Sequence, residues 1–94
     1  MFKNMTLDEL KTELEKRTEF RFEIIDNKLL KLHIEDFDIF IRCEKPMRNA
    51  NPIILVRCNP VILSFCGSKK HLRKVIEYLD FIKWMATRNE QISF

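Results

Sequence analysis

Residues 19–43 read EFRFEIIDNKLLKLHIEDFDIFIRC, and this stretch decides the fold. Apolar side chains take every second position in three successive runs. Alternate side chains of a strand point to opposite faces, so each run predicts a strand with one buried face. The alternating apolar residues are Phe20, Phe22 and Ile24, then Leu30, Leu32 and Ile34, then Phe37, Ile39, Ile41 and Cys43. We expect strands over about 19–25, 28–34 and 37–44.

Two further runs, residues 53–58 and 61–66, are almost continuously apolar and β-branched, which predicts two more strands. Residues 45–52 hold prolines and asparagines, which exclude this segment from a ladder and favour one long loop. Short polar turns join the other strands: Asp26-Asn27-Lys28, Glu35-Asp36 and Asn59-Pro60. The pattern indicates five strands in antiparallel succession.

The chain opens with an expected helix over residues 6–17. Thr6 followed three positions later by Glu9 is the pattern of a capping box, and leucines recur at helical spacing behind it. Most of the remaining positions are charged, so this helix is expected to bury one narrow seam of leucines.

A longer helix is expected over residues 68–87, with Ser68 as its N-cap and a short tail over 88–94. Its apolar face is formed by Leu72, Val75, Ile76, Leu79, Ile82 and Ala86. The order helix, five strands, helix predicts one α+β domain over residues 1–94, a five-stranded antiparallel meander with both helices on one sheet face.

Composition narrows the class of protein. The 94 residues are 46% apolar and 33% charged, which suits one compact domain. The net charge of +3 is too small to indicate nucleic-acid binding by itself. The aliphatic runs are far shorter than the roughly 20 residues of a membrane span, and the polar opening lacks a secretory core. Three cysteines are an odd set for a disulfide framework. We therefore expect an intracellular protein with reduced thiols, no membrane association and no cofactor.

Strand alternation places basic residues at one end of the expected sheet. The turn at 26–28, the loop at 45–52 and the exit of the last strand all lie there, whereas the turn at 35–36 carries acidic residues to the other end. Residues 67–94 hold six basic and three acidic side chains, which accounts for the net charge. The candidate phosphate-binding residues are Lys28, Lys45, Arg48, Lys69, Lys70, Arg73 and Lys74. Free first-turn amides beside lysines favour phosphate, although these lysines also suit a solvated turn.

The stretch GSKKHLRKVIEYLDFIKWM over residues 67–85 resembles the start of the second helix of double-stranded RNA-binding domains. The resemblance implies phosphate contacts by Lys69 and Lys70 and by Arg73 or Lys74. The chain departs from that family in its five expected strands instead of three, in the bulk of residues 75–76, and in lacking that family's hairpin motif. The order of elements is also similar to that of the signal-recognition-particle Alu-binding fold.

A second apolar patch on the closing helix indicates a protein interface. Its residues, Tyr78, Phe81, Trp84 and Met85, lie off the sheet-facing side. They suit a homodimer or a hetero-complex. Alternatively, Tyr78 and Phe81 are covered by the tail at 91–94. The outward face of the sheet is another candidate, because Phe40 shares it with Lys31 and Arg42 and could stack bases or form a dimer interface.

Chemistry has weaker support in the sequence. Cys66 with His71 is the candidate pair for thiol catalysis, but the sequence offers no oxyanion pocket beyond Gly67. Cys43 converges with this pair, yet a fourth zinc ligand is missing. The acidic residues at 35–38 suit a solvated turn as well as a hard cation.

Two functions follow as hypotheses. The first is a non-enzymatic module whose basic end contacts a phosphate backbone, with structured RNA favoured over DNA. The second is a protein-interaction module acting through the second apolar face of the closing helix.

Overall fold

The computed structural model describes residues 5–45 and 47–91. Its elements are α1 (Leu7–Arg17), β1 (Glu23–Ile25), β2 (Leu29–Ile34), β3 (Phe37–Glu44), β4 (Ile53–Cys58), β5 (Val61–Cys66), the 3₁₀ helix η1 (Lys69–His71) and α2 (Leu72–Gln91). The strands form one sheet in the order β1-β2-β3-β4-β5, and each neighbouring pair is antiparallel. The expected α+β meander is confirmed.

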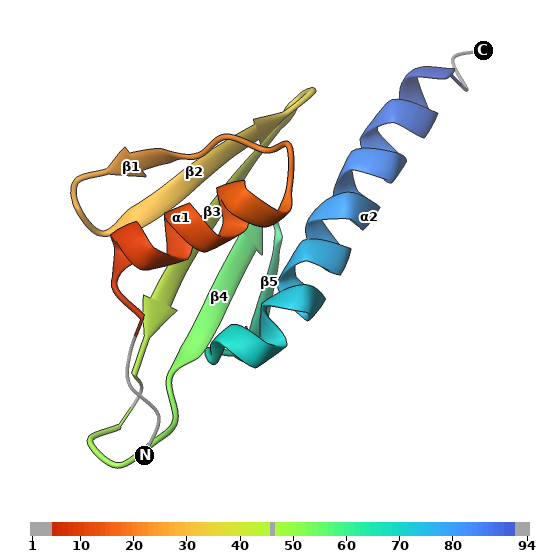
Figure 1. The fold of residues 1–94 in the computed structure, drawn as a ribbon. Helices are drawn as coiled ribbons and strands as arrows, with labels where there is room; N and C mark the ends of the chain where they lie inside the picture. The colour runs from red at the N-terminus through yellow and green to blue at the C-terminus, as the bar shows by residue number, and fades with distance from the viewer. Residues whose placement is uncertain (1–4, 46, 92–94) are drawn as a thin grey trace.

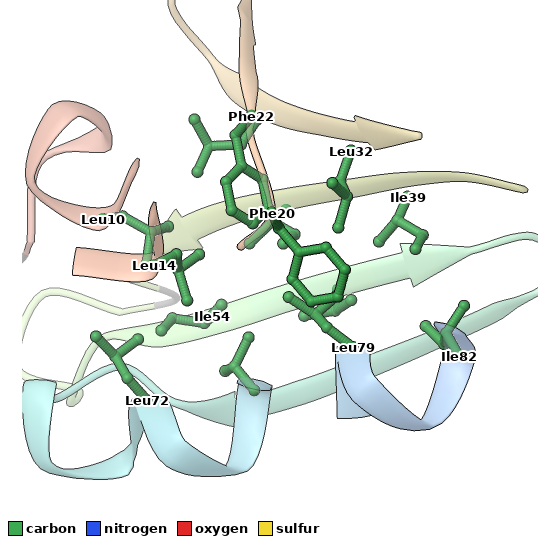
Figure 2. Close-up of a cluster of buried hydrophobic side chains, with 14 of the residues drawn as sticks. Leu10, Leu14, Phe20, Phe22, Leu32, Ile39, Ile54, Leu72, Leu79 and Ile82 are labelled. Atoms are coloured by element: carbon green, nitrogen blue, oxygen red, sulfur yellow. The ribbon is translucent and has the colours of Figure 1, made fainter. Parts of the chain in front are cut away.

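Both helices lie on the same face of the sheet, as the sequence predicts (Figure 1). α1 packs against β2 and β3, while α2 runs along the β5 side and its last turns extend past the ends of β4 and β5. Leucines of α1 and α2 point toward the isoleucines of the middle strands between the layers (Figure 2). Within residues 5–45 and 47–91, no helix lies on the opposite face of the sheet.

The start of α1 follows directly from its sequence. The Glu9 amide donates to Thr6 Oγ1 at 3.1 Å, and the Thr6 amide donates to Glu9 Oε1 at 3.3 Å, so the capping box is present. Leu10 and Leu14 are fully buried. The helix is therefore held by its cap and one leucine seam.

The first strand is shorter than the expected 19–25, because β1 begins only at Glu23. The Phe22 amide donates to the Glu15 carboxylate at 2.8 Å, and the Phe20 amide donates to Thr18 Oγ1 at 3.1 Å. Side chains thus take the donors that a ladder would use. Both phenylalanine rings are still buried. The alternating pattern therefore correctly predicted which side chains are buried, although the backbone here is not paired in the sheet.

The turns also have clear local causes. Asp26 and Asn27 adopt left-handed φ values of 52° and 55°, which these residue types tolerate, and β2 starts at Leu29 instead of Lys28. Glu35 has a φ of 52° in the two-residue turn between β2 and β3. The remaining strand bounds agree with the expected 37–44, 53–58 and 61–66.

The closing helix differs from its expected form at both ends. Ser68 makes no side-chain cap, because its Oγ is hydrogen-bonded with His71 Nδ1 at 2.5 Å, and η1 precedes the α-helix. α2 continues to Gln91, so the first part of the expected tail is helical. Residues 92–94, the rest of that tail, lie outside the described residues. No helix within 5–45 and 47–91 has the length and apolar character needed to cross a membrane.

Candidate functional site

The edge strand β5 and the outer side of α2 together carry most of the exposed apolar side chains. Among the described residues, seven large apolar side chains are exposed, and six of them lie on β5 or on the outer side of α2. These six are Val61, Ile62, Leu63, Phe81, Trp84 and Met85. We call them the β5–α2 surface. Ile62 lies on the sheet face away from the helices, whereas Val61 and Leu63 lie on the helix face.

Aromatic rings organise the α2 part of this surface. Phe81 and Trp84 stack with their ring centroids 6.2 Å apart, and each is about half exposed, at 51% and 54%. The Arg88 guanidinium lies 4.9 Å from the centroid of Trp84. Such a contact fixes an exposed ring at little entropic cost, which suits a docking surface.

A groove of about 380 Å³ lies between α2 and the edge of the sheet. Val61 and Leu63 line it from β5, and Phe81 and Met85 line it from α2. Tyr78 forms part of its wall and packs against Phe65, with ring centroids 5.9 Å apart. Burial raises the pKa of the Tyr78 hydroxyl, so the wall of the groove stays uncharged at neutral pH.

The predicted interface residues are thus brought together by the structure. Phe81, Trp84 and Met85 are exposed on one side of α2, while Tyr78 is half buried beneath them. Sequence reasoning missed the part that β5 plays. A continuous apolar run is typical of a strand buried on both faces. The predicted meander already places the fifth strand at an edge of the sheet, and that position was the signal for an exposed strand.

The basic residues are less concentrated than strand alternation suggested. The first five lie at loops and turns: Lys28 between β1 and β2, Lys45 and Arg48 between β3 and β4, and Lys69 and Lys70 in η1. Arg73 and Lys74 follow in the first turn of α2. The outermost strands of a five-stranded sheet are roughly 19 Å apart at about 4.8 Å per spacing. Lys28 therefore lies far from the η1 lysines, although topology places both at one end.

Lys69 is also paired with an acidic residue. Its Nζ lies 3.3 Å from Glu13 Oε1, and the hydrogen bond from Lys69 lowers the pKa of the Glu13 carboxyl. The Arg17 guanidinium donates to the Lys69 carbonyl at 3.5 Å. Asp8 and Glu9 of α1 line a hollow together with Glu13 and Lys69, so acidic residues border the basic end. Tracing the strands alone could not place α1 beside η1.

Lys70 and Lys74 remain the more available cations. Both are exposed, and neither takes part in any salt bridge within the described parts of the chain. Arg73, between them, lies 3.6 Å from Glu77. Lys28, Lys45 and Arg48 are also exposed and without a salt bridge in the described residues, but they lie in other loops, so Lys70 and Lys74 are the available cations at η1 and the start of α2.

The open face of the sheet holds a mixed apolar and basic hollow of about 190 Å³. The Arg57 guanidinium lies over the Phe40 ring, 5.0 Å from its centroid, and Ile62 lines the far side. Arg42 is paired with Glu44 at 3.1 Å. His33 on this face hydrogen-bonds Asp38 at 2.7 Å, which lowers the pKa of the aspartate.

The candidate thiol pair does not meet directly. Cys66 Sγ lies 3.9 Å from Ser68 Oγ, and it is this hydroxyl that contacts His71. Burial raises the pKa of the other thiols, Cys43 and Cys58, and thereby keeps them protonated. In the part of the chain that the structure describes, no three His, Cys, Asp or Glu side chains are placed to hold a metal ion.

Comparison with known proteins identifies no relative: no family model, no curated protein and no solved structure matches this chain.

Proposed function

We propose that this chain is a non-enzymatic protein-interaction module that docks its partner on the β5–α2 surface. One observation carries the proposal: four of the seven large apolar side chains exposed in the described residues, those of Val61, Leu63, Phe81 and Met85, line the same groove. Scattered apolar side chains are normal on a protein, whereas a contiguous group marks an interface. Aromatic residues and methionine are also the types enriched in interfaces.

The surroundings of the surface support a macromolecular partner. The groove is lined mainly by apolar side chains, so it fits an apolar protein surface. We place the module inside the cell, since Cys43, Cys58 and Cys66 are free thiols and Cys66 is exposed. Cys66 contacts Ser68 and not His71, which favours binding over thiol catalysis.

The test is a co-purification with two matched variants. Phe81→Glu puts a charge at the centre of the surface without disturbing the core, because the ring is half exposed. Lys74→Glu changes an exposed residue elsewhere on the same helix. We expect the wild type and Lys74→Glu to be recovered in a stoichiometric protein complex, with a second copy or another protein, and Phe81→Glu to lose it. A wild type recovered without any stoichiometric protein partner would overturn the proposal.

A second candidate function is contact with a phosphate backbone, with structured RNA favoured. The exposed and unpaired state of Lys70 and Lys74 favours it. The test is fluorescence anisotropy with duplex RNA, single-stranded RNA and duplex DNA at about 50 and 200 mM salt, because phosphate contacts weaken steeply with salt. Lys70→Glu with Lys74→Glu should abolish binding, whereas Lys16→Glu, at an exposed position of α1 outside the candidate residues, should preserve it. Absence of binding at the lower salt concentration would remove this candidate.

A further inference from the structure

We propose that the partner on the β5–α2 surface is a second copy of this chain, joined by antiparallel pairing of the two β5 strands about a twofold axis at Ser64. This inference rests on the proposed interaction function and names its partner. The resulting assembly has one ten-stranded sheet with all four helices on the same face.

The backbone of β5 shows which groups are free to pair. The Gly67 amide donates to the Pro52 carbonyl at 2.9 Å, directly beyond the β4–β5 ladder. Bonded pairs alternate along an antiparallel ladder, so Val61, Leu63 and Phe65 direct their amides and carbonyls toward β4. The alternate residues Ile62, Ser64 and Cys66 direct their amides and carbonyls to the open edge of the sheet.

An axis at Ser64 uses all three of these residues. Ser64 then pairs with itself, and Ile62 of each copy pairs with Cys66 of the other. Residues that face each other across an antiparallel pair lie on one face of the sheet. Leu63 consequently meets Phe65 of the other copy on the helix face, beside the groove lined by Phe81 and Met85. The second strand therefore adds apolar side chains beside that groove.

Charge favours a second copy at this edge. β5 reads VILSFC and contains no charged residue, no proline and no bulge in its ladder with β4. Lysines, prolines and bulges are the features by which natural edge strands prevent pairing with another chain. Two copies that each carry a net charge of +3 repel one another, and the repulsion is weakest where the facing surface is neutral.

The available area is of the size that a dimer requires. The exposed parts of Val61, Ile62, Leu63, Phe81 and Met85 amount to roughly 500 Å², given their exposed fractions and side-chain sizes. The open backbone of a six-residue strand, about 20 Å long, adds to this area. A stable interface buries about 800 Å² per partner, and these groups together approach that value.

The first experiment is sedimentation equilibrium over a range of protein concentrations. We expect the wild type to dimerise and Ser64→Pro to remain monomeric. Proline at position 64 removes a donor from the open edge and leaves the bonds to β4 in place. Ser64→Ala is the matched control, and it should dimerise like the wild type. A dimer that Ser64→Pro leaves intact would overturn the proposal.

The second experiment keeps the proposal testable if Ser64→Pro fails to fold by circular dichroism. In a background with Cys43, Cys58 and Cys66 replaced by Ala, Ser64→Cys should form an intermolecular disulfide under mild oxidation. Bonded antiparallel pairs have Cα atoms about 5.5 Å apart, within disulfide range. Ile62→Cys in that background should not, since the two copies of residue 62 would lie about 14 Å apart. The reverse pattern would contradict an axis at Ser64.

These outcomes separate the two proposals. A wild type that is monomeric at every concentration overturns the second copy as partner. If that monomer is nevertheless recovered with a different stoichiometric protein, and Phe81→Glu loses it, the proposed interaction function stands.

Discussion

The two edge strands of the sheet, β1 and β5, differ in length, in charge and in how their free backbone groups are bonded. β1 has three residues, includes Glu23, and follows a segment whose amides are bonded by the side chains of Glu15 and Thr18. β5 has six residues and no charge, and all but Phe65 are exposed. A short, charged edge resists pairing with another chain, whereas a long neutral one invites it. The comparison indicates that association, if it occurs through the sheet, occurs at β5.

The two helices show the same contrast. α1 buries Leu10 and Leu14 and covers its outer side with ion pairs, including Lys11 with Glu15 at 3.1 Å. α2 buries one face equally well but presents Phe81 and Trp84 on the other. The outer side of α1 is therefore polar, as is usual for a solvent-exposed surface, whereas the outer side of α2 exposes apolar side chains to solvent.

The largest expected effect is on the α1 side. Leu14→Ala should lower the free energy of unfolding by about 3 kcal/mol, because the side chain is fully buried and its removal leaves a cavity. Urea unfolding followed by circular dichroism measures the change. Glu9→Gln serves as control, since a glutamine at that position can still close the capping box. A loss below about 1 kcal/mol would show that α1 is not anchored by its leucine seam.

A second prediction concerns the attachment of β5 to β4. A Cβ at Gly67 would lie 2.8 Å from both the carbonyl carbon and the oxygen of Pro52, so Gly67→Ala must shift backbone atoms. We expect a loss of about 2 kcal/mol, whereas Lys70→Ala, at an exposed position nearby, should be neutral. Thermal unfolding of both variants measures the change in Tm. An unchanged Tm for Gly67→Ala would show that the backbone at Gly67 and Pro52 shifts at little cost.

A third prediction tests how the β1 edge is closed. Glu15→Ala leaves the Phe22 amide without its acceptor and should cost about 1 kcal/mol at pH 7. The hydrogen bond from the Phe22 amide holds the pKa of Glu15 below its ordinary value of 4.5. The carboxylate therefore stabilises the fold above about pH 4.5, and this contribution is lost as the pH falls through the lower folded-state pKa.

The control for this edge is Glu15→Gln, which keeps an acceptor oxygen but does not titrate. Unfolding measured between pH 3 and 7 should show a shallower loss of stability in acid for Glu15→Gln than for the wild type. Superimposable pH profiles would mean that Glu15 does not control this segment.

The smallest effect is expected on the exposed side of α2. In the monomeric Ser64→Pro background, Phe81→Ala should change the free energy of unfolding by no more than about 0.5 kcal/mol, because the ring is half exposed. The same measurement on Leu79→Ala, which removes a fully buried side chain two positions earlier, should give a loss of about 3 kcal/mol. Similar losses for the two variants would show that Phe81 belongs to the core and not to a docking surface.

Much of the fold could be predicted from local patterns. The alternation from Leu30 to Cys43 correctly indicated strands and their buried face, and the capping box at Thr6 correctly located α1. The same alternation at Phe20 and Phe22 predicted a strand start that is too early, because a ring can be buried while its backbone is not paired in the sheet. Ser68 failed as a cap because a histidine three residues later competes for its hydroxyl.

The candidate sites divide in the same way. The aromatic face at Phe81 and Trp84 follows from helical periodicity alone, and the structure places it in the open. The basic end was overestimated because Lys69 lies against Glu13, 56 positions earlier in the chain. A pattern within a few neighbouring residues cannot predict a contact between residues so far apart in the sequence.

By itself, the sequence determined the order of the elements, their buried faces and the turns between them, because these depend on periodicities of a few residues and on local backbone preferences. Tertiary structure alone decided how much of the edge strand β5 stays exposed and which charges met. Both depend on contacts between segments far apart in the chain, where packing of the whole layer selects the neighbours. The apolar run at β5 would suit a buried strand, and it lies open to solvent because the sheet ends there.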